Sequence, residues 1–158
     1  MLHIRPMTAD DWPVVEEIYA EGIRTGVATF ETNTPDWNTF DSTRLRAPRL
    51  VLSKGPEILG WAAASPVSAR SCYRGVVELS IYVREHARGN GVGFALMEKL
   101  EHEALAVGLW TLQATITATN HVSRRLMEKR GFRLVGYRER IGTIGDVWHD
   151  TVIYEKRL

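Results

Sequence analysis

The stretch that decides the fold is "RGNGVG", residues 88–93, with glycines at 89, 91 and 93. Glycines this close together permit either a tight turn or a close approach of the backbone to a ligand. The loop follows a predicted strand at 75–83 and opens a predicted helix at 91–108. A helix N-terminus has free N–H groups and about half a positive charge, to which Arg88 adds a full one. The segment therefore indicates a strand-to-helix turn that is also suited to binding an anion.

Two common phosphate motifs do not fit this loop. A Walker loop ends in Gly-Lys-Ser/Thr, which is absent here. A dinucleotide-binding fingerprint belongs to the first βα unit, whereas this loop follows the fourth predicted strand and is too short. What remains is the pattern Arg-x-x-Gly-x-Gly directly after a strand of the type "LSIYV".

Strand and helix signals alternate around this loop, with no internal repeat. Period-two patterns predict seven strands, at residues 2–7, 49–54, 58–65, 75–83, 111–117, 132–140 and 147–157. Helical periodicity and capping residues predict four helices, one after Thr8 or Asp10, a weaker one near 36–46, and two at 91–108 and 120–131. Residues 26–37 are expected to form a loop. We therefore predict the α/β (α+β) class, with a single domain over residues 1–158 and a central mixed, largely antiparallel sheet flanked by helices.

Composition narrows the choice of function. The chain has 158 residues, 25% of them charged, and a formal net charge of +1. This charge gives no reason to expect nucleic acid or an anionic membrane as partner, and no apolar run reaches the roughly 20 residues of a membrane span. The N-terminal residues lack the pattern of an export signal, and Cys72 is the single cysteine, so we expect a cytoplasmic protein without disulfides. Cys72 has no neighbouring base, and the histidines lack metal-ligand spacing, so neither thiol nor metal catalysis is expected.

Glu78 is the first candidate for chemistry. In the strand 75–83, Val77 and Leu79 point to one face while Glu78 and Ser80 point to the other. An unpaired carboxylate in a dry position is costly. Glu78 should therefore pair with a cation, face solvent or line a cleft.

Three motifs in order resemble those of the GCN5-related N-acetyltransferases (GNAT): "ELSIYV", "RGNGVG", and Asn120 opening a helix that ends in Gly-Phe. The resemblance implies that acetyl-CoA is the co-substrate, that the sheet splays between strands 4 and 5, and that pantetheine pairs with the freed backbone. The cofactor-binding residues it implies are Ile81, Tyr82 and Val83 through their main chain, together with Arg88, Gly89, Asn90, Gly91, Val92, Gly93, Phe94, Asn120 and Ser123.

A closer resemblance, to the phosphinothricin and methionine sulfone/sulfoximine acetyltransferase branch, rests on "GVATFET" (26–32), "SARSCYRGVVELSIYV" (68–83) and "GDVWHD" (145–150). It implies acetylation of the α-amine of a small amino-acid analogue, and a homodimer. The carboxylate of such a substrate calls for an arginine, for which Arg70 and Arg74 are the candidates; the alternative is that both are solvated surface residues. The full set of expected substrate-binding residues is Phe30, Arg70, Arg74, Glu78, Leu79, Ser80 and Trp148.

For direct transfer of the acetyl group to the amine, we expect Glu78 to be the general base, acting directly or through water. We expect N–H groups near 81–83 to polarise the thioester carbonyl. Family members often have a tyrosine four residues before the glycine of Gly-Phe, or a histidine in the close branch. Here the position is Met127, which cannot donate a proton. The acid role stays open: the thiolate leaves unassisted, or water, Tyr82 or His149 protonates it.

Two alternatives remain at this stage. The acceptor could be another amine, such as a polyamine, an aminoglycoside or a protein N-terminus, although the chain has no acidic cluster that would suit a cationic acceptor. The chain could also be a non-catalytic acyl-CoA-binding module, which Glu78 argues against and Met127 slightly favours.

Overall fold

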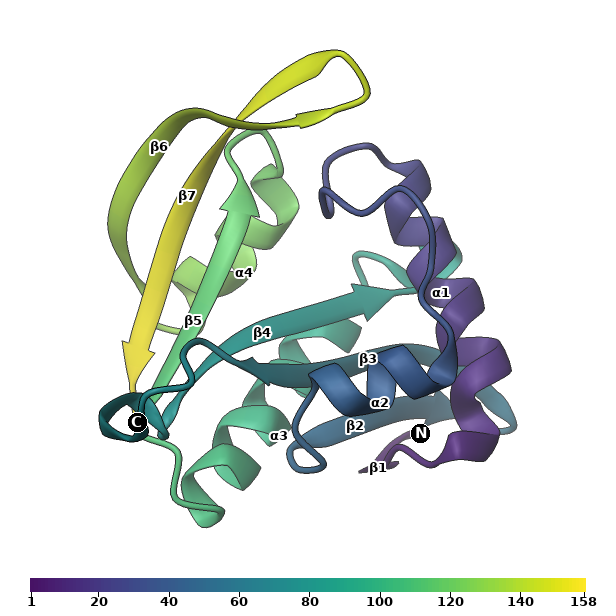
Figure 1. Ribbon diagram of the computed structural model, residues 1–158. Helices are drawn as coiled ribbons and strands as arrows, with labels where there is room; N and C mark the ends of the chain where they lie inside the picture. Colours follow the sequence, from purple (N-terminus) through teal and green to yellow (C-terminus); the bar gives the residue numbers. More distant parts are fainter.

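The computed structural model describes residues 1–158 and contains one seven-stranded sheet. The strand order is β1-β2-β3-β4-β5-β7-β6, and every neighbouring pair is antiparallel except β4 and β5, which are parallel (Figure 1). The strands are β1 (Leu2–Pro6), β2 (Arg49–Lys54), β3 (Glu57–Pro66), β4 (Val76–Val83), β5 (Thr111–Thr117), β6 (Arg133–Ile144) and β7 (Val147–Arg157).

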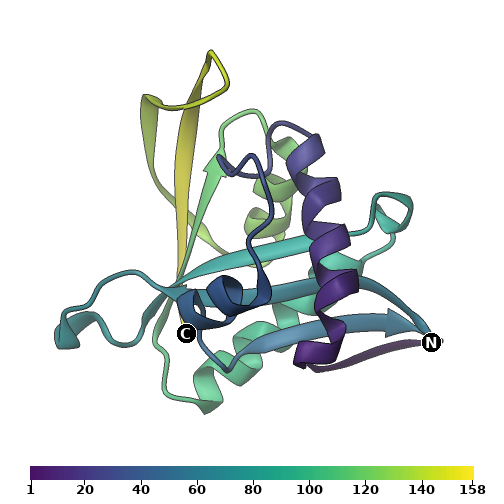
Figure 2. The ribbon, with the colours of Figure 1, turned by 45° about the vertical axis from the view of Figure 1, so that its right-hand side comes forward.

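Helices cover both faces of the sheet, as Figures 1 and 2 show. One face carries α1 (Trp12–Arg24) and α2 (Trp37–Thr43), which pack with Trp61 in an aromatic-rich core. The other face carries α3 (Val92–Ala106) and α4 (His121–Lys129) over a larger aliphatic core. None of these helices combines the length and the apolar character that crossing a bilayer would require.

The predicted fold class is confirmed, including the seven strands, the four helices and the mixed sheet. The helix predicted near 36–46 is shorter, because the chain turns to extended conformation at Arg44. The strand predicted at 132–140 continues to Ile144, because two irregularities in its register with β7 allow it to bend without ending. Three short 3-10 turns, at Ala9–Asp11, Ser71–Tyr73 and Glu85–Ala87, have no periodic signal and were not predicted.

The feature that creates the site is the short pairing of β4 with β5. Only three residue pairs join these strands, with Val76, Val77 and Glu78 opposite Thr111, Leu112 and Gln113. Beyond Glu78 the two strands diverge, while β3 continues to pair with β4 as far as Val83. The expected splay between strands 4 and 5 is therefore present, and it opens the sheet on the side of β4 that faces β5.

Candidate active site

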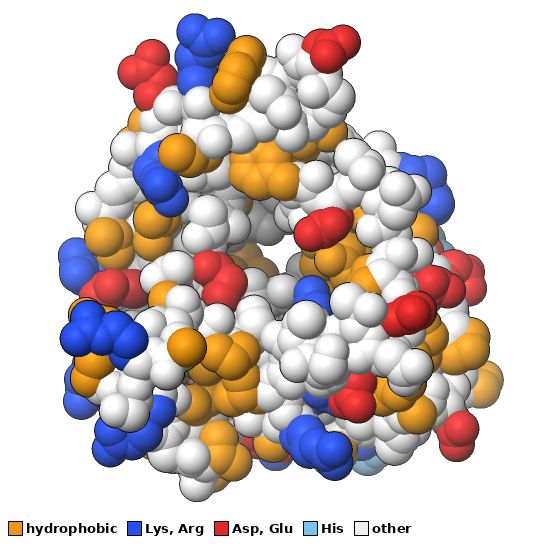
Figure 3. Space-filling view, in the orientation of Figure 1, with side chains coloured by type: hydrophobic (Ala, Val, Ile, Leu, Met, Phe, Trp, Pro, Cys, Tyr) orange, Lys and Arg blue, Asp and Glu red, His pale blue; other side chains and the backbone are white.

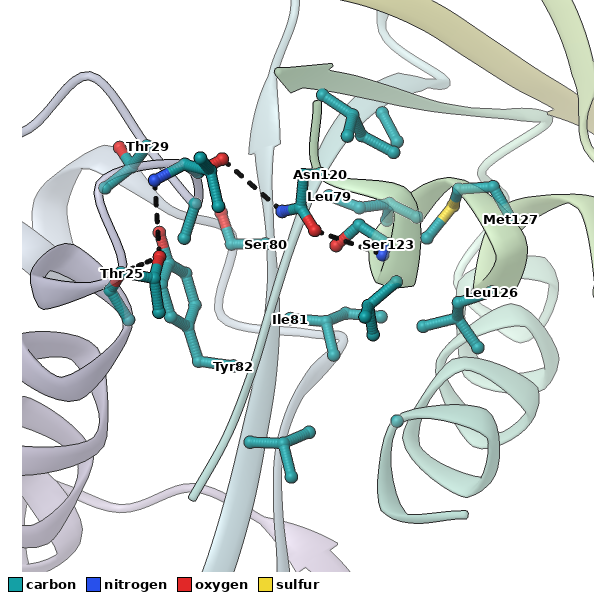
Figure 4. A pocket seen from close by; sticks show the side chains of 18 of the residues that line it. Thr25, Thr29, Leu79, Ser80, Ile81, Tyr82, Asn120, Ser123, Leu126 and Met127 are labelled. Atoms are coloured by element: carbon teal, nitrogen blue, oxygen red, sulfur yellow. Dashed lines mark hydrogen bonds between the residues drawn. The ribbon is translucent and has the colours of Figure 1, made fainter. Parts of the chain in front are cut away.

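A cavity of about 800 Å³ lies between the diverging strands β4 and β5. Figure 3 shows it as a hollow near the centre of the face seen in Figure 1. Its walls come from the end of α1 and the loop that follows, from β4 and β5, from the glycine loop with the start of α3, and from α4 (Figure 4). Two segments far apart in sequence, residues 25–31 and 120–129, thus face each other across β4.

The cavity side of β4 has free backbone groups. Arg84 N donates to Leu59 O at 2.7 Å and Val67 N to Val76 O at 3.4 Å, so alternation turns the even-numbered residues of β4 toward β3. The N–H groups of Ile81 and Val83 therefore face the cavity, as does the carbonyl of Ile81. The carbonyl of Val83 already accepts from Arg88 Nε at 3.3 Å.

Tyr82 departs from its expected role for the same reason. Its main chain pairs with Trp61 of β3, so the residue presents only its side chain to the cavity. The Tyr82 ring stacks on Trp61 at 4.8 Å between centroids, and burial raises the pKa of its hydroxyl well above the usual range. Tyr82 is thus a protonated wall residue on the α1 side of the cleft.

The glycine loop makes a tight strand-to-helix turn and also leaves open space beside its backbone. Gly89 and Gly91 each have φ of 79°, the left-handed region that side chains disfavour, and Gly91 is the N-cap of α3 with no side-chain partner. A Cβ at either glycine would meet nothing within 4 Å, so the space above the loop is open. Arg88, Gly89, Gly91, Val92, Gly93 and Phe94 line the cavity, whereas the Asn90 side chain folds back onto the carbonyls of Ala87 and Arg88.

Four cationic side chains line the cavity, and none of them forms an ion pair. Arg88 belongs to the glycine loop, and Arg125 and Lys129 lie on α4 beside it. Arg44 follows α2 and lies apart from these three. No motif or spacing in the sequence pointed to Arg44, Arg125 or Lys129 as residues of a site.

Asn120 connects the two sides of the cleft. Its Oδ1 accepts the backbone N–H of Ser123 at 3.3 Å, which caps α4, and its Nδ2 donates to Val27 O at 3.4 Å (Figure 4). Both Asn120 and Ser123, which the family resemblance implied as cofactor-binding residues, line the cavity.

Glu78 lies in the cavity where β4 and β5 part, and β5 holds both of its oxygens. Oε1 accepts from Gln113 Nε2 at 2.9 Å and from Thr115 Oγ1 at 3.0 Å, while Oε2 accepts the Thr115 backbone N–H at 2.7 Å. Burial raises the pKa of Glu78, and these hydrogen bonds oppose the rise without cancelling it. Glu78 is therefore a positioned carboxylate with increased basicity, and one lone pair of Oε2 remains available.

The bond to Thr115 also explains where the pairing of β4 and β5 ends. Leu158 N bonds Trp110 O and Ala118 N bonds Asp150 O, so the odd-numbered residues of β5 face β4. One more step of the parallel ladder would direct the Thr115 N–H to the Leu79 carbonyl. The Glu78 carboxylate accepts that N–H instead, so it satisfies the donor that the splay would otherwise leave unpaired.

The expected substrate-binding residues separate into two groups. Phe30, Glu78, Leu79 and Ser80 line the cavity; the Phe30 ring also packs edge-on against His149 of β7, with centroids 6.3 Å apart. Trp148 does not reach the cavity: it is exposed on the β6–β7 hairpin beneath the guanidinium of Arg140.

Arg70 and Arg74 are also outside the cavity, in the loop that projects from the edge of the molecule in Figure 2. Arg74 stacks on Trp110 at 5.2 Å and Arg70 on Tyr73 at 5.7 Å. Their loop precedes β4 and so lies at the closed end of the cleft, where β4 and β5 are still paired. This single chain thus places both residues as surface arginines.

The position where the family has a proton-donating side chain is occupied by Met127, as the sequence indicated. Met127 is buried and lines the cavity on α4, but a thioether has no proton to give. Tyr82 lies across the cleft from it (Figure 4), and His149 lies outside the cavity.

Comparison with known proteins decides the family. The model of the acetyltransferase (GNAT) family matches residues 12–132, a span that includes the cleft, the glycine loop and α4. The chain belongs to the GNAT family. As a GNAT protein with relatives named as N-acetyltransferases over almost its whole length, it is an N-acetyltransferase.

Three similar proteins show where this GNAT chain lies within the family. It is 33% identical to phosphinothricin N-acetyltransferase of Alcaligenes faecalis, over 98% of this chain and 82% of the relative. It is 30% identical to L-methionine sulfoximine/L-methionine sulfone acetyltransferase of Pseudomonas aeruginosa, over 98% and 94%. A crystal structure of a GNAT phosphinothricin acetyltransferase from Sinorhizobium meliloti, in complex with AcCoA, superposes with a TM-score of 0.88 at 30% identity, covering 99% of this chain and 88% of that one.

Proposed function

We propose that this N-acetyltransferase transfers the acetyl group of acetyl-CoA to the α-amine of a small amino-acid analogue, such as phosphinothricin, methionine sulfone or methionine sulfoximine. The observation that supports this most is Glu78, a carboxylate with a raised pKa, in the same cavity as the free edge of β4. The relatives named above support the substrate class.

The residues of the cleft fit coenzyme A. The inward N–H groups of Ile81 and Val83 suit the amides of pantetheine, which are extended like a strand. The open loop with Arg88, Gly89, Gly91, Val92, Gly93 and Phe94 suits the pyrophosphate, and the unpaired cations Arg125 and Lys129 add charge beside it. Asn120 and Ser123 complete this side of the cleft. Acetyl-CoA supplies the activated acyl group as a thioester.

Glu78 supplies the proton transfer that the acceptor needs. An α-ammonium group must lose a proton before its nitrogen can attack, and the available lone pair of Oε2 accepts that proton directly or through a water molecule. As the C–N bond forms and the C–S bond breaks, the acetyl group passes to nitrogen and coenzyme A leaves as a thiolate. The second proton of the attacking amine passes to this thiolate, directly or through water. Cys72 is exposed and outside the cavity, so the transfer is direct and uses no acyl-enzyme.

A panel of amines, assayed by release of free coenzyme A, tests this function. We expect turnover on methionine sulfone and phosphinothricin, weak turnover on polyamines and aminoglycosides, and a large loss of kcat in Glu78→Gln with little change in acetyl-CoA affinity. Faster turnover on a polyamine or an aminoglycoside would show that the acceptor is not an amino-acid analogue. Tight acetyl-CoA binding without turnover on any amine would identify a binding module instead.

We also propose that the protein is a cytoplasmic homodimer. Large apolar side chains are exposed along the β6–β7 hairpin, namely Leu134, Val135, Tyr137, Ile141, Val147 and Trp148, which is more than isolated surface residues explain. The single free cysteine suits a reducing compartment, as does the use of acetyl-CoA. Sedimentation velocity should give a dimer, and Val147→Glu should shift it toward monomer; a monomer at every concentration would refute the assembly.

A further inference from the structure

Arg44 is a cation that lines the cavity and has no ion-pair partner in the chain. Its guanidinium lies over the buried ring of Phe40, with Cζ 4.3 Å from the centroid, and its Nε is buried without a hydrogen-bond partner. Its side chain donates a hydrogen bond to Thr43 Oγ1 next to it in the chain, at 3.2 Å, and its guanidinium lies against the hydroxyl of Tyr19. No carboxylate lies within ion-pair distance.

The neighbouring Arg49 shows what a structural arginine looks like in this region. It donates to Asp41 Oδ1 at 2.6 Å, to Leu45 O at 3.0 Å and to Arg44 O at 3.1 Å, and so ties α2 to β2. A partly buried guanidinium is stable when such partners satisfy it. Arg44 lacks them and faces the cavity, so it is available to an anionic ligand.

A backbone hydrogen bond next to Arg44 determines the position along β4 at which Arg44 enters the cavity. Leu45 N donates to Ala64 O at 2.8 Å, and Ala64 lies opposite Leu79 in the β3–β4 ladder. On the face that carries Glu78 and Ser80, their partners in β3 are the small residues Ser65 and Ala63. The long side chain of Arg44 can therefore extend over β3 toward the level of Glu78 without a large residue between them.

The anion that Arg44 would bind differs from the phosphates of coenzyme A. Arg88, Arg125 and Lys129 lie with the glycine loop and α4, whereas Arg44 lies on the opposite wall with Tyr19 and Tyr82. Arg44 is close enough to Tyr19 to lower the pKa of that hydroxyl, against the larger effect of burial. The second anion site is thus on the acceptor side of β4.

We propose that Arg44 binds the α-carboxylate of the acceptor amino acid. This inference rests on the proposed function and specifies its substrate: in an α-amino acid the amine is one carbon from the carboxylate, so a carboxylate held by Arg44 directs the amine toward Glu78. Arg44 thereby takes the role that the sequence suggested for Arg70 or Arg74, and it distinguishes amino acids from simple amines.

The test compares methionine sulfone with 3-(methylsulfonyl)propylamine, which is the same molecule without its carboxylate. In Arg44→Gln we expect kcat/KM for methionine sulfone to fall roughly 10- to 100-fold, the effect of losing one charge-assisted contact, mainly through KM. Turnover of the decarboxylated amine should stay within about twofold of the wild type. Arg44→Lys, which keeps the charge, should be intermediate, and Arg46→Gln, at an exposed arginine outside the cavity two residues along the chain, is the matched control with no effect on either substrate.

Calorimetric binding of methionine sulfone to the enzyme with coenzyme A present separates this inference from the proposed function. If the wild type binds and acetylates the amino acid and Arg44→Gln changes neither, the inference fails and the function stands. If binding depends on Arg44 but no acetylation occurs, the function fails and the inference stands. Equal losses on both substrates, or no binding by the wild type, would also overturn the role of Arg44.

Discussion

The backbone N–H of Thr115 donates to the carboxylate of Glu78 at 2.7 Å, at the point where the parallel pairing of β4 and β5 stops. The catalytic base that we propose therefore also occupies a position in the sheet. One residue pair orients the carboxylate and satisfies the first unpaired donor of the cleft.

Thr115→Val tests the positioning of Glu78. Valine preserves shape and the backbone N–H but removes the Oγ1 donor, which acts to lower the pKa of Glu78. We expect kcat to fall severalfold and the acidic limb of the kcat pH profile to move to higher pH. Thr111→Val, on the same strand but without a bond to Glu78, is the control. An unchanged limb would show that the hydroxyl does not act on the base.

The pH dependence of Glu78 itself has a definite sign. Burial raises its pKa, and the base acts only when ionised, so kcat/KM should rise with pH through a value above the usual glutamate range. In Glu78→Gln this limb should disappear, leaving only the ionisation of the amine substrate. Persistence of the same limb in the variant would assign the base to another group.

The variant Gly91→Ala separates a role of the glycine loop in cofactor binding from the effect of backbone strain. Alanine at this position meets no atom within 4 Å but must adopt φ of 79°, and Gly145 in the β6–β7 turn has φ of 58° with equally open space. Both alanine variants should lose about 1 kcal/mol of unfolding free energy. Only Gly91→Ala should raise the Kd of acetyl-CoA, because Gly91 lines the cavity and Gly145 does not. Equal Kd values in the two variants would refute the role of the loop.

Asp11 provides a stability test away from the cavity. Its carboxylate accepts from Arg5 Nη1 and Nη2, both at 2.7 Å, and from Thr8 N at 2.8 Å, which joins β1 to the start of α1. Asp11→Ala should lower the unfolding free energy by about 1–2 kcal/mol at neutral pH.

The pKa of Asp11 is lowered, first by the bond from Arg5, so this stabilisation is complete above its usual value of 3.8 and is lost as pH falls through the lower folded value. The difference between wild type and variant in chemical denaturation should shrink in that acidic range. Asp10→Ala, at an exposed neighbour without such bonds, should have little effect. A constant difference down to the lowest pH would rule out the ion pair as its source.

Local patterns predicted most of this fold, because each strand and helix has its own periodicity and end signals. They also located Glu78 and the glycine loop, since both belong to one continuous strand-loop-helix segment. The contacts of Glu78 with Gln113 and Thr115 could not be predicted, because they depend on the register of two strands separated by α3. Arg70 and Arg74 are near Glu78 in sequence, yet the cleft opens in the other direction along β4. Arg44 has no local signal, since its place depends on how α2 packs on the sheet.

The three residue pairs between β4 and β5 have a mechanical consequence. They are the only ladder that joins the strands β1 to β4 to the strands β5 to β7, so backbone pairing links the two parts of the sheet at one end of the cleft alone. Across the cavity the same parts meet again where Asn120 bonds Val27 and where Phe30 packs on His149. The cleft is therefore closed by backbone pairing at the Glu78 end, whereas at the far end it is bridged only by one side-chain hydrogen bond and one aromatic contact.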